Sequence, residues 1–334
     1  MMAGTIKNIL RKLILRNHRV YRIISDLKRL LKNLKPGSLL ELNSVSKQYR
    51  QNSLNLNQVS RLTGASAAIV VHLYYTDSWP SFRESIKNYP DPFDLFITLP
   101  MHNSGYKPEI MKDYKSAYVF EVPNRGRDVL PFLQIASHLE KLGYEYVLKM
   151  HSKKSPHRKD GNKWFAQIVS SLLPKDKKIM DELIMVLKDK KTGIVGPKGQ
   201  YISLTVNFPA NGPRIAEALS NIYYPKITDK LIRNRKQHGF FAGTMFWARL
   251  DALRPILDRK FKINRFDPER GQIDATFAHA LERVFCLVPQ IEMRDLYEIG
   301  TRSIKKIDYK TTNIPNWSEV YIGPKPERKR RPKS

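Results

Sequence analysis

Short apolar runs alternate with amphipathic stretches through the middle of the chain. Four of these runs are rich in β-branched and aromatic residues and have the length of buried strands, namely residues 67–75, 93–100, 117–123 and 144–150. Helical spacing of apolar residues separates or follows them, at residues 81–87, 128–142, 162–173 and 177–190. Strands that alternate with helices form βαβ units. The pattern therefore predicts an α/β fold with a mainly parallel sheet flanked by helices.

The rest of the chain completes this division. We expect further strands at residues 193–197 and 240–249, and helices near 213–223 and from Gln272 to Arg283. Near the N-terminus, apolar residues fall on one helical stripe, cations fill the opposite face, and Pro36-Gly37 ends the pattern. The predicted organisation is a basic amphipathic helical segment (1–36), a linker (37–64), an α/β domain (65–310) and a basic C-terminal tail (311–334).

The charge balance narrows the choice of partners. The chain holds 59 Lys and Arg against 31 Asp and Glu, a formal net charge of +28, which needs a polyanionic partner. Nucleic acid, anionic lipid and nucleotide phosphates are all candidates. The basic helix at residues 5–35 can lie on an anionic bilayer surface, or it can pack against the domain as a solvated helix.

Neither a spanning segment nor a disulfide is expected. No apolar run reaches the roughly 18 residues of a membrane span, and Cys286 is the one cysteine. A lone cysteine fits a reducing compartment. We therefore expect a cytoplasmic protein bound peripherally to the inner face of a plasma membrane.

Polar and charged residues follow each of the four predicted strands at its end. They are Tyr75-Thr76-Asp77, Met101-His102-Asn103, Asn124 to Asp128, and His151 to Lys154. Ligands of open parallel sheets bind beyond the carboxyl ends of the strands. Because the topology brings these loops to one edge, the sequence predicts a cationic cleft for an anionic ligand.

The loop Asn124-Arg125-Gly126-Arg127-Asp128 suits anion binding. The guanidinium groups of Arg125 and Arg127 are planar forks that match phosphate or carboxylate. Asp128 can cap the following helix, whose N-terminal amides would then face the cleft. In the simpler alternative, Asp128 is only a cap and one arginine pairs with it.

The stretch YVLKMHSKK places several basic groups at the end of a buried strand. Side chains alternate along a strand, so Lys149, His151 and Lys153 share one side if the extended conformation continues to residue 153. A diphosphate would relieve their mutual repulsion. The alternative is a surface loop whose lysines reach into solvent. His72 lies inside an apolar strand and is expected to be a satisfied core histidine.

Four motifs together resemble the rhamnan synthesis protein F family of bacterial polysaccharide-assembly proteins. They are EVPNRGRDVLPF (Glu121 to Phe132), YEYVLKMHSKKS (Tyr144 to Ser155), GFFAGTMFW (Gly239 to Trp247) and GQIDATFAHALER (Gly271 to Arg283). The resemblance covers about residues 65–300. It implies a glycosyltransferase, expected to be a rhamnosyltransferase, that uses dTDP-rhamnose and a lipid-linked saccharide acceptor to build a cell-surface polysaccharide.

The order of elements is also similar to the nucleotide-binding half of inverting transferases with the Rossmann-like GT-A fold. Those enzymes place an Asp-x-Asp after the fourth strand, where it holds a divalent cation such as Mg²⁺ or Mn²⁺. This chain has His151-x-Lys153 there, which leaves metal use open. Lysine and histidine cations could stabilise the departing diphosphate directly. The resemblance thus implies a donor site of Tyr75, Asn124, Arg125, Arg127, Asp128, Lys149, His151, Lys153 and Lys154.

An inverting transfer needs a base for the acceptor hydroxyl. By the same likeness Asp274 is the candidate, with Glu282 second; alternatively, Asp274 is a first-turn acid favoured by the helix dipole. His238, Gly243 and Trp247 would form the acceptor side, with Trp247 offering a stacking face to a sugar.

Two other classes of protein remain possible. A nucleic-acid-binding protein would explain the charge, but no helix-turn-helix, zinc-ligand or RNP-type motif is present, so specific binding is not expected. A non-catalytic scaffold in polysaccharide assembly would keep its function without Asp274 and Lys153.

Overall fold

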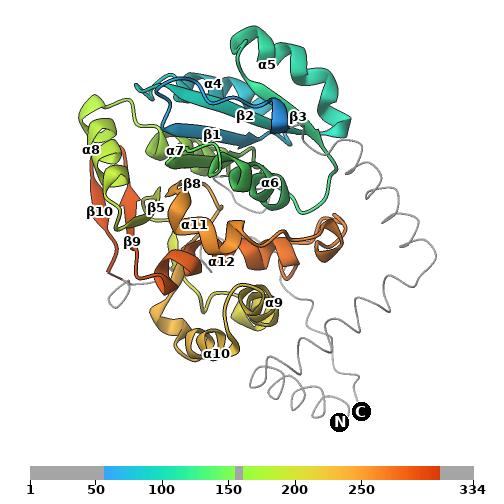
Figure 1. Cartoon of the computed structure of the whole chain (residues 1–334), viewed down its shortest axis with the longest axis vertical. Helices are drawn as coiled ribbons and strands as arrows, with labels where there is room; N and C mark the ends of the chain where they lie inside the picture. The colour runs from blue at the N-terminus through green and yellow to red at the C-terminus, as the bar shows by residue number, and fades with distance from the viewer. Residues whose placement is uncertain (1–55, 155–160, 309–334) are drawn as a thin grey trace, which may run out of the picture.

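The computed structural model describes residues 56–154 and 161–308 of the chain. The main strands are β1 (Ala67–His72), β2 (Phe93–Pro100), β3 (Tyr118–Val122), β4 (Tyr146–His151), β5 (Thr192–Pro197), β8 (Phe246–Arg249), β9 (Asp295–Ile299) and β10 (Ile304–Lys306). They form one sheet in the order β10-β9-β5-β8-β4-β1-β2-β3 (Figure 1). Strands β8 and β10 run antiparallel to their neighbours and the other six are parallel to one another. The predicted α/β fold with a mainly parallel sheet is confirmed.

Helices cover both faces of this sheet. One face carries α4 (Trp79–Ile86), α7 (Gly161–Leu172) and α8 (Lys177–Lys188), and the other carries α6 (Val129–Leu139), α11 (Leu250–Leu257) and α12 (Phe277–Ile291). Each layer buries its own apolar cluster against the sheet. Because both faces are covered, β1 and β4 are buried along their whole length. Lys149 and His151 therefore lie in a strand that has no exposed residue.

Two further helices extend beyond α12. They are α9 (Phe208–Ser220) and α10 (Pro225–Arg233), which lie together at the end of the molecule away from β1 to β3 (Figure 1). Next to α12, β6 (Tyr201–Ser203) and β7 (Gly239–Phe241) form a separate two-stranded sheet. The short helix α5 (Lys107–Asp113) leads into the edge strand β3. None of the helices in the described residues is long and apolar enough to cross a membrane.

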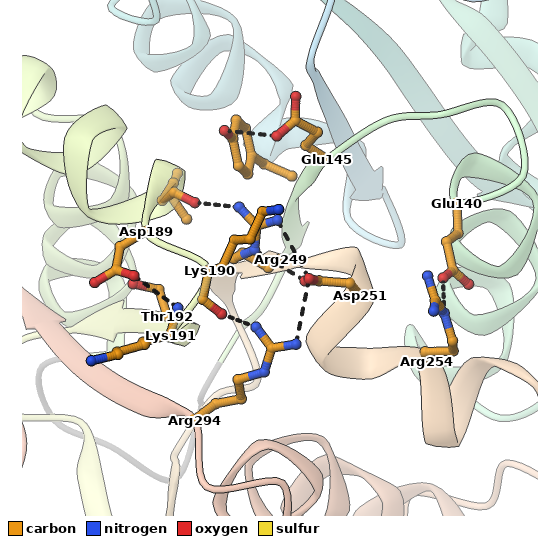
Figure 2. A network of polar contacts seen from close by, with 12 residues as sticks. Glu140, Glu145, Asp189, Lys190, Lys191, Thr192, Arg249, Asp251, Arg254 and Arg294 are labelled. Atoms are coloured by element: carbon orange, nitrogen blue, oxygen red, sulfur yellow. Dashed lines mark hydrogen bonds and ion pairs between the residues drawn. The ribbon is translucent and has the colours of Figure 1, made fainter.

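Ion pairs close the amino edge of the sheet. Arg249 lies 3.0 Å from Asp251 through its Nε and donates to the carbonyl oxygen of Leu187 at 2.9 Å (Figure 2). Arg294 lies 3.4 Å from the other oxygen of Asp251 and donates to the carbonyl oxygen of Lys190. The partners of both arginines are thus the Asp251 carboxylate and backbone carbonyl oxygens at and after the end of α8. Arg249 and Arg294 therefore have structural roles at this edge.

The pattern located most elements but misjudged two regions. The predicted strand 240–249 is divided between β7 and β8, because Gly243 (φ 89°) and Thr244 (φ 52°) turn the chain between them. The predicted helix 272–283 is α12, which begins at Phe277 and continues to Ile291. Residues 1–36, most of the predicted linker and the tail beyond 308 lie outside the described residues, so those predictions stay untested.

Candidate functional site

The carboxyl ends of the parallel strands carry a buried polar row. His72 at the end of β1 lies between Thr98 on β2 and His151 on β4 in the strand register. Its Nδ1 is 2.9 Å from the Thr98 hydroxyl oxygen, and the ring is buried. His72 is therefore the satisfied core histidine that the sequence predicted, and it borders the candidate site.

Lys149 lies beneath this edge rather than on it. Its side chain is 1% exposed, and its ammonium donates to the Asp128 carboxylate and, at 2.9 Å, to the carbonyl oxygen of Thr244. The rings of Phe132 and Phe285 lie 5.5 and 6.0 Å from the same ammonium. A buried cation needs such a carboxylate, because desolvation would otherwise neutralise it. In this structure Lys149 offers no surface to a ligand, which corrects its predicted direct contact with a diphosphate.

The second neighbour of Asp128 is His151, whose Nδ1 lies 3.3 Å from the same carboxylate oxygen. Burial alone would raise the pKa of Asp128, but His151 and Lys149 outweigh it and hold that pKa below its usual range. Burial lowers the pKa of His151 to about 3 and that of His72 to about 4. Both imidazoles are thus neutral at pH 7. At that pH the charge in this cluster is one Lys149–Asp128 pair.

Asp128 precedes α6 but does not cap it. Its backbone is helical (φ −75°, ψ −16°), and its carboxylate makes no hydrogen bond to the first turn. The N–H groups of Val129 and Leu130 instead donate to the carbonyl oxygen of Gly126, both at 3.1 Å. The predicted cap and the predicted free amides are therefore wrong. The carboxylate is turned to Lys149, where it compensates a charge.

Arg127 joins the loop after β3 to the segment that precedes α12. Its Nε lies 3.1 Å from the Glu269 carboxylate, and its other nitrogens contact the His279 ring and the carbonyl oxygen of Gln272. Arg125 is buried and donates to the carbonyl oxygen of Phe266 at 2.9 Å. Segments about 140 residues apart are thus joined side by side. The two predicted phosphate forks have protein partners in this structure.

His279 joins Arg127 to the N-terminus of α12. Arg127 Nη1 lies 2.8 Å from its Nε2. On the other side of the ring, the Thr276 N–H donates to Nδ1 at 3.3 Å and the Thr276 hydroxyl oxygen lies 2.8 Å from the same nitrogen. Burial lowers the pKa of His279, which keeps the ring neutral. Arg127 is therefore held by a carboxylate, a carbonyl oxygen and a neutral imidazole.

Asp274 lies near the end of the segment that precedes α12. The structure places it ahead of the N-cap Thr276, so it is not in the first turn of α12. Its Oδ2 lies 3.4 Å from Arg283 Nη2, and its Oδ1 accepts from the Ala275 N–H at 3.0 Å. Its side chain is partly exposed. Asp274 therefore retains access to solvent beside the groups that hold Arg127.

Backbone strain is concentrated around these contacts. Arg127 (φ 54°), Thr244 (φ 52°) and Ala275 (φ 68°) are three of the five non-glycine residues with positive φ among the described residues. A left-handed conformation at a residue with a Cβ costs about 1–2 kcal/mol. Arg127 adjoins Asp128, Thr244 accepts from Lys149, and Ala275 adjoins Asp274. Strain of this kind clusters at functional sites.

The remaining residues of the predicted donor site lie closer to the surface at the same edge of the sheet. Asn124 is exposed, and the Lys154 ammonium lies 2.5 Å from Asp77 and 5.1 Å from the Tyr75 ring. Lys153 lies 5.3 Å from the Trp164 ring. The strand ends at His151, so Lys153 is not part of its alternation. These groups, unlike Lys149, are placed where a ligand can reach them.

The predicted acceptor residues are separated. Trp247 is 0% exposed, stacks on Tyr89 at 5.1 Å and donates to the carbonyl oxygen of Leu172, so it offers no face to a sugar. His238 lies 3.2 Å from Gln290 and is half buried. Gly243 has φ 89°, and a Cβ there would meet the Trp164 ring at 3.2 Å. Strand alternation explains the error, because Phe246 and Trp247 face the two opposite cores.

A pocket of about 310 Å³ opens at the carboxyl ends of β5 and β9, beside α7. It is lined by Gln167, Ile168, Ser170, Ser171, Pro197, Lys198, Gln200, Gly300 and Thr301. Gln200 accepts from the Trp164 indole N–H at 2.8 Å, and the Lys153 ammonium lies over the Trp164 ring. The pocket is therefore connected to the predicted donor edge through one side-chain contact. Its small hydroxyl and amide residues carry no sequence signal.

The described residues do not fit the metal site of the GT-A enzymes. They contain no group of three or more His, Cys, Asp or Glu side chains arranged to hold a metal ion. Asp128 is bound to Lys149 and Asp77 is paired with Lys154. We derive no step through a metal ion for this chain.

Comparison with known proteins agrees with the motifs. The family model for rhamnan synthesis protein F matches residues 16–293. A protein from two strains of Xanthomonas campestris pv. campestris, named "Uncharacterized protein WxcX", is 34% identical over 226 residues, which are 67% of this chain. The match spans 31% of the length of that relative. The chain belongs to the rhamnan synthesis protein F family.

Proposed function

We propose that the chain is a glycosyltransferase that moves a sugar, expected to be rhamnose, from a nucleoside diphosphate donor to a saccharide acceptor with inversion. One observation carries the proposal. The loop after β3, the end of β4 and the segment before α12 meet at the carboxyl edge of a parallel sheet, and a strained residue marks each contact. Such an edge is where open α/β sheets bind nucleotides.

The donor diphosphate would bind outside the buried Lys149–Asp128 pair. Lys153 and Lys154 are within reach of solvent at the end of β4, and lysine is a good point-charge partner for phosphate. Lys154 would exchange its exposed partner Asp77 for the diphosphate, at small cost. The buried residues Lys149, His151 and Asp128 would keep the loops at this edge in position.

Asp274 would be the base. The acceptor hydroxyl oxygen attacks the anomeric carbon, the bond from that carbon to the diphosphate oxygen breaks, and the diphosphate leaves with the electron pair. Asp274 takes the hydroxyl proton. Lys153 stabilises the negative charge that develops on the leaving group, which is the term that usually contributes most to catalysis.

The pocket beside α7 would receive the acceptor. Ile168 and Pro197 supply apolar contact for the C–H face of a pyranose, and Ser171 and Gln200 supply hydrogen-bonding groups. Its volume of about 310 Å³ lies at the lower end of small-molecule sites. The pocket thus replaces the predicted Trp247 wall.

The proposal is tested with the full chain and a panel of nucleoside diphosphate sugars that includes dTDP-rhamnose. Donor binding is measured by calorimetry, and release of nucleoside diphosphate is followed with and without a rhamnose-containing saccharide. We expect one donor to bind. Lys153→Ala should weaken that binding, whereas Lys188→Ala, an exposed lysine on α8, should not.

Asp274→Asn separates chemistry from binding. Loss of a general base lowers turnover by roughly 10²–10⁴-fold, while donor affinity should stay within a factor of about two. Asp258→Asn, at an exposed position after α11, is the matched control. If no nucleotide sugar in the panel binds or is consumed, the proposed function is wrong.

A further inference from the structure

Helix α10 and its flanks carry a surface of exposed apolar and basic side chains. Tyr224, which precedes the helix, is 82% exposed, and Ile227 is also exposed. Lys226, Lys230 and Arg233 are exposed beside them. We call these five residues the α10 surface. Large exposed apolar residues ringed by charge mark interaction sites.

The helical spacing orders this surface. Residues 226, 230 and 233 are separated by four and three positions, so the three cations form one row along the helix. Thr228 and Leu231 are buried and attach the helix to the domain. Tyr224 and Ile227 therefore lie beside a basic row on the outward side, as in helices that lie flat at a bilayer surface.

The charge around the helix is strongly positive. Residues 224–237 contain five Lys and Arg, at 226, 230, 233, 235 and 236, against one acid, Asp229. Arg235 is turned inward over the Phe208 ring at 4.9 Å. The nearby Glu292 accepts from the Tyr223 hydroxyl at 2.9 Å, and Met293, which follows it, is 88% exposed. A third apolar side chain thus lies near this end of α10.

The α10 surface is linked to the candidate site through α9. Helix α10 packs against α9, and α9 packs against α12. Asn211 of α9 is fully buried, and its side-chain oxygen accepts from the Ala275 N–H at 3.3 Å, next to Asp274. A partner bound to the α10 surface would therefore be connected to the residues around Asp274 through α9.

We propose that the α10 surface docks onto an anionic lipid bilayer. The ammonium and guanidinium groups would contact lipid phosphates, and Tyr224 and Ile227 would enter the headgroup region. Tyrosine favours such interfaces because one end is apolar and the other is polar. A polynucleotide would use the cations but not an exposed isoleucine, so the apolar residues favour lipid. The proposal does not depend on glycosyl transfer.

A local probe tests this surface apart from the basic segment at residues 5–35. Ile227→Cys is labelled with an environment-sensitive fluorophore in the full chain, since the native Cys286 is buried. Phosphatidylglycerol vesicles should shift its emission to shorter wavelength, whereas phosphatidylcholine vesicles should not. Met185→Cys on α8, where the native side chain is 72% exposed, is the matched control and should not respond. An unshifted probe at 227 on chains that bind the vesicles would overturn the proposal.

Charge reversal provides the second measurement. Because each basic residue near an anionic bilayer favours binding, Lys226→Glu with Lys230→Glu should lower vesicle partitioning by about tenfold or more. The same pair of changes at Lys188 and Lys190 should have a smaller effect. Equal effects at both places, or a probe at 227 that responds to single-stranded DNA but not to vesicles, would show that α10 is not a lipid-binding surface.

Discussion

The buried Lys149–Asp128 pair supports the sharpest test of the structure. Lys149 is 1% exposed and its carboxylate partner is almost as enclosed. In Lys149→Met the Asp128 charge loses the cation that is bound to it inside the core. Breaking such a pair from one side costs about 3–5 kcal/mol of unfolding free energy, because a charge stays buried without compensation.

The double variant removes that penalty. Lys149→Met with Asp128→Asn leaves two neutral side chains of similar volume, so its cost should be much less than the sum of the single costs. We expect a coupling energy of at least about 3 kcal/mol from the double-mutant cycle. Urea or guanidinium unfolding of the four proteins at pH 7 and 25 °C measures it, with constant slopes as the check on two-state behaviour.

The exposed pair Lys154–Asp77 is the matched control. Its nitrogen–oxygen distance is 2.5 Å, but the two side chains are 50% and 61% exposed. Solvent screens such a pair, so Lys154→Met with Asp77→Asn should give a coupling below about 1 kcal/mol. If the two cycles give the same coupling, Lys149 is not buried with Asp128 and the description of the site is wrong.

Two further predictions concern the same edge. Burial lowers the pKa of His72 to about 4 in the folded protein, from about 6.5 in the unfolded chain, so its stabilising contribution is complete above pH 6.5 and is lost as the pH falls towards 4. Urea titrations at stepped pH should show a loss of roughly 3 kcal/mol of unfolding free energy over this range. His72→Gln should give a flatter profile. Arg127 has φ 54°, so Arg127→Gly should be about 1 kcal/mol more stable than Arg127→Ala in thermal or urea unfolding, and an equal or lower stability of the glycine variant would contradict the left-handed backbone.

The sequence located the sheet because hydrophobic burial dominates its pattern. The predicted strand 93–100 coincides with β2, and the predicted strand 144–150 differs from β4 by a few residues. Central parallel strands must be apolar on both faces, so their runs are unmistakable. The four polar loops lie at one edge of the sheet because β1, β2, β3 and β4 run parallel.

The burial of Lys149 could not be read in the same way. A lysine in a strand is usually an edge or surface residue, and its enclosure depends on Asp128 and on the carbonyl oxygen of Thr244, 21 and 95 residues away in sequence. Trp247 shows the converse error, because an aromatic residue in a glycine-rich segment has the same pattern in a binding wall and in a core. Contacts between distant segments decided both cases.

The Lys149–Asp128 pair also changes where the positive charge at this edge comes from. Inside the core the two charges compensate each other, so Lys149 adds little field beyond Asp128. Lys154 is balanced in part by Asp77 and Arg127 by Glu269. Lys153 contacts the Trp164 ring and has no carboxylate partner among the described residues. Within the proposed donor site, Lys153 is therefore a cation that no described carboxylate balances, and its indole partner also contacts Gln200 of the pocket. The Lys149–Asp128 pair has a positioning role, because it joins the start of α6, strand β4 and the turn at Thr244.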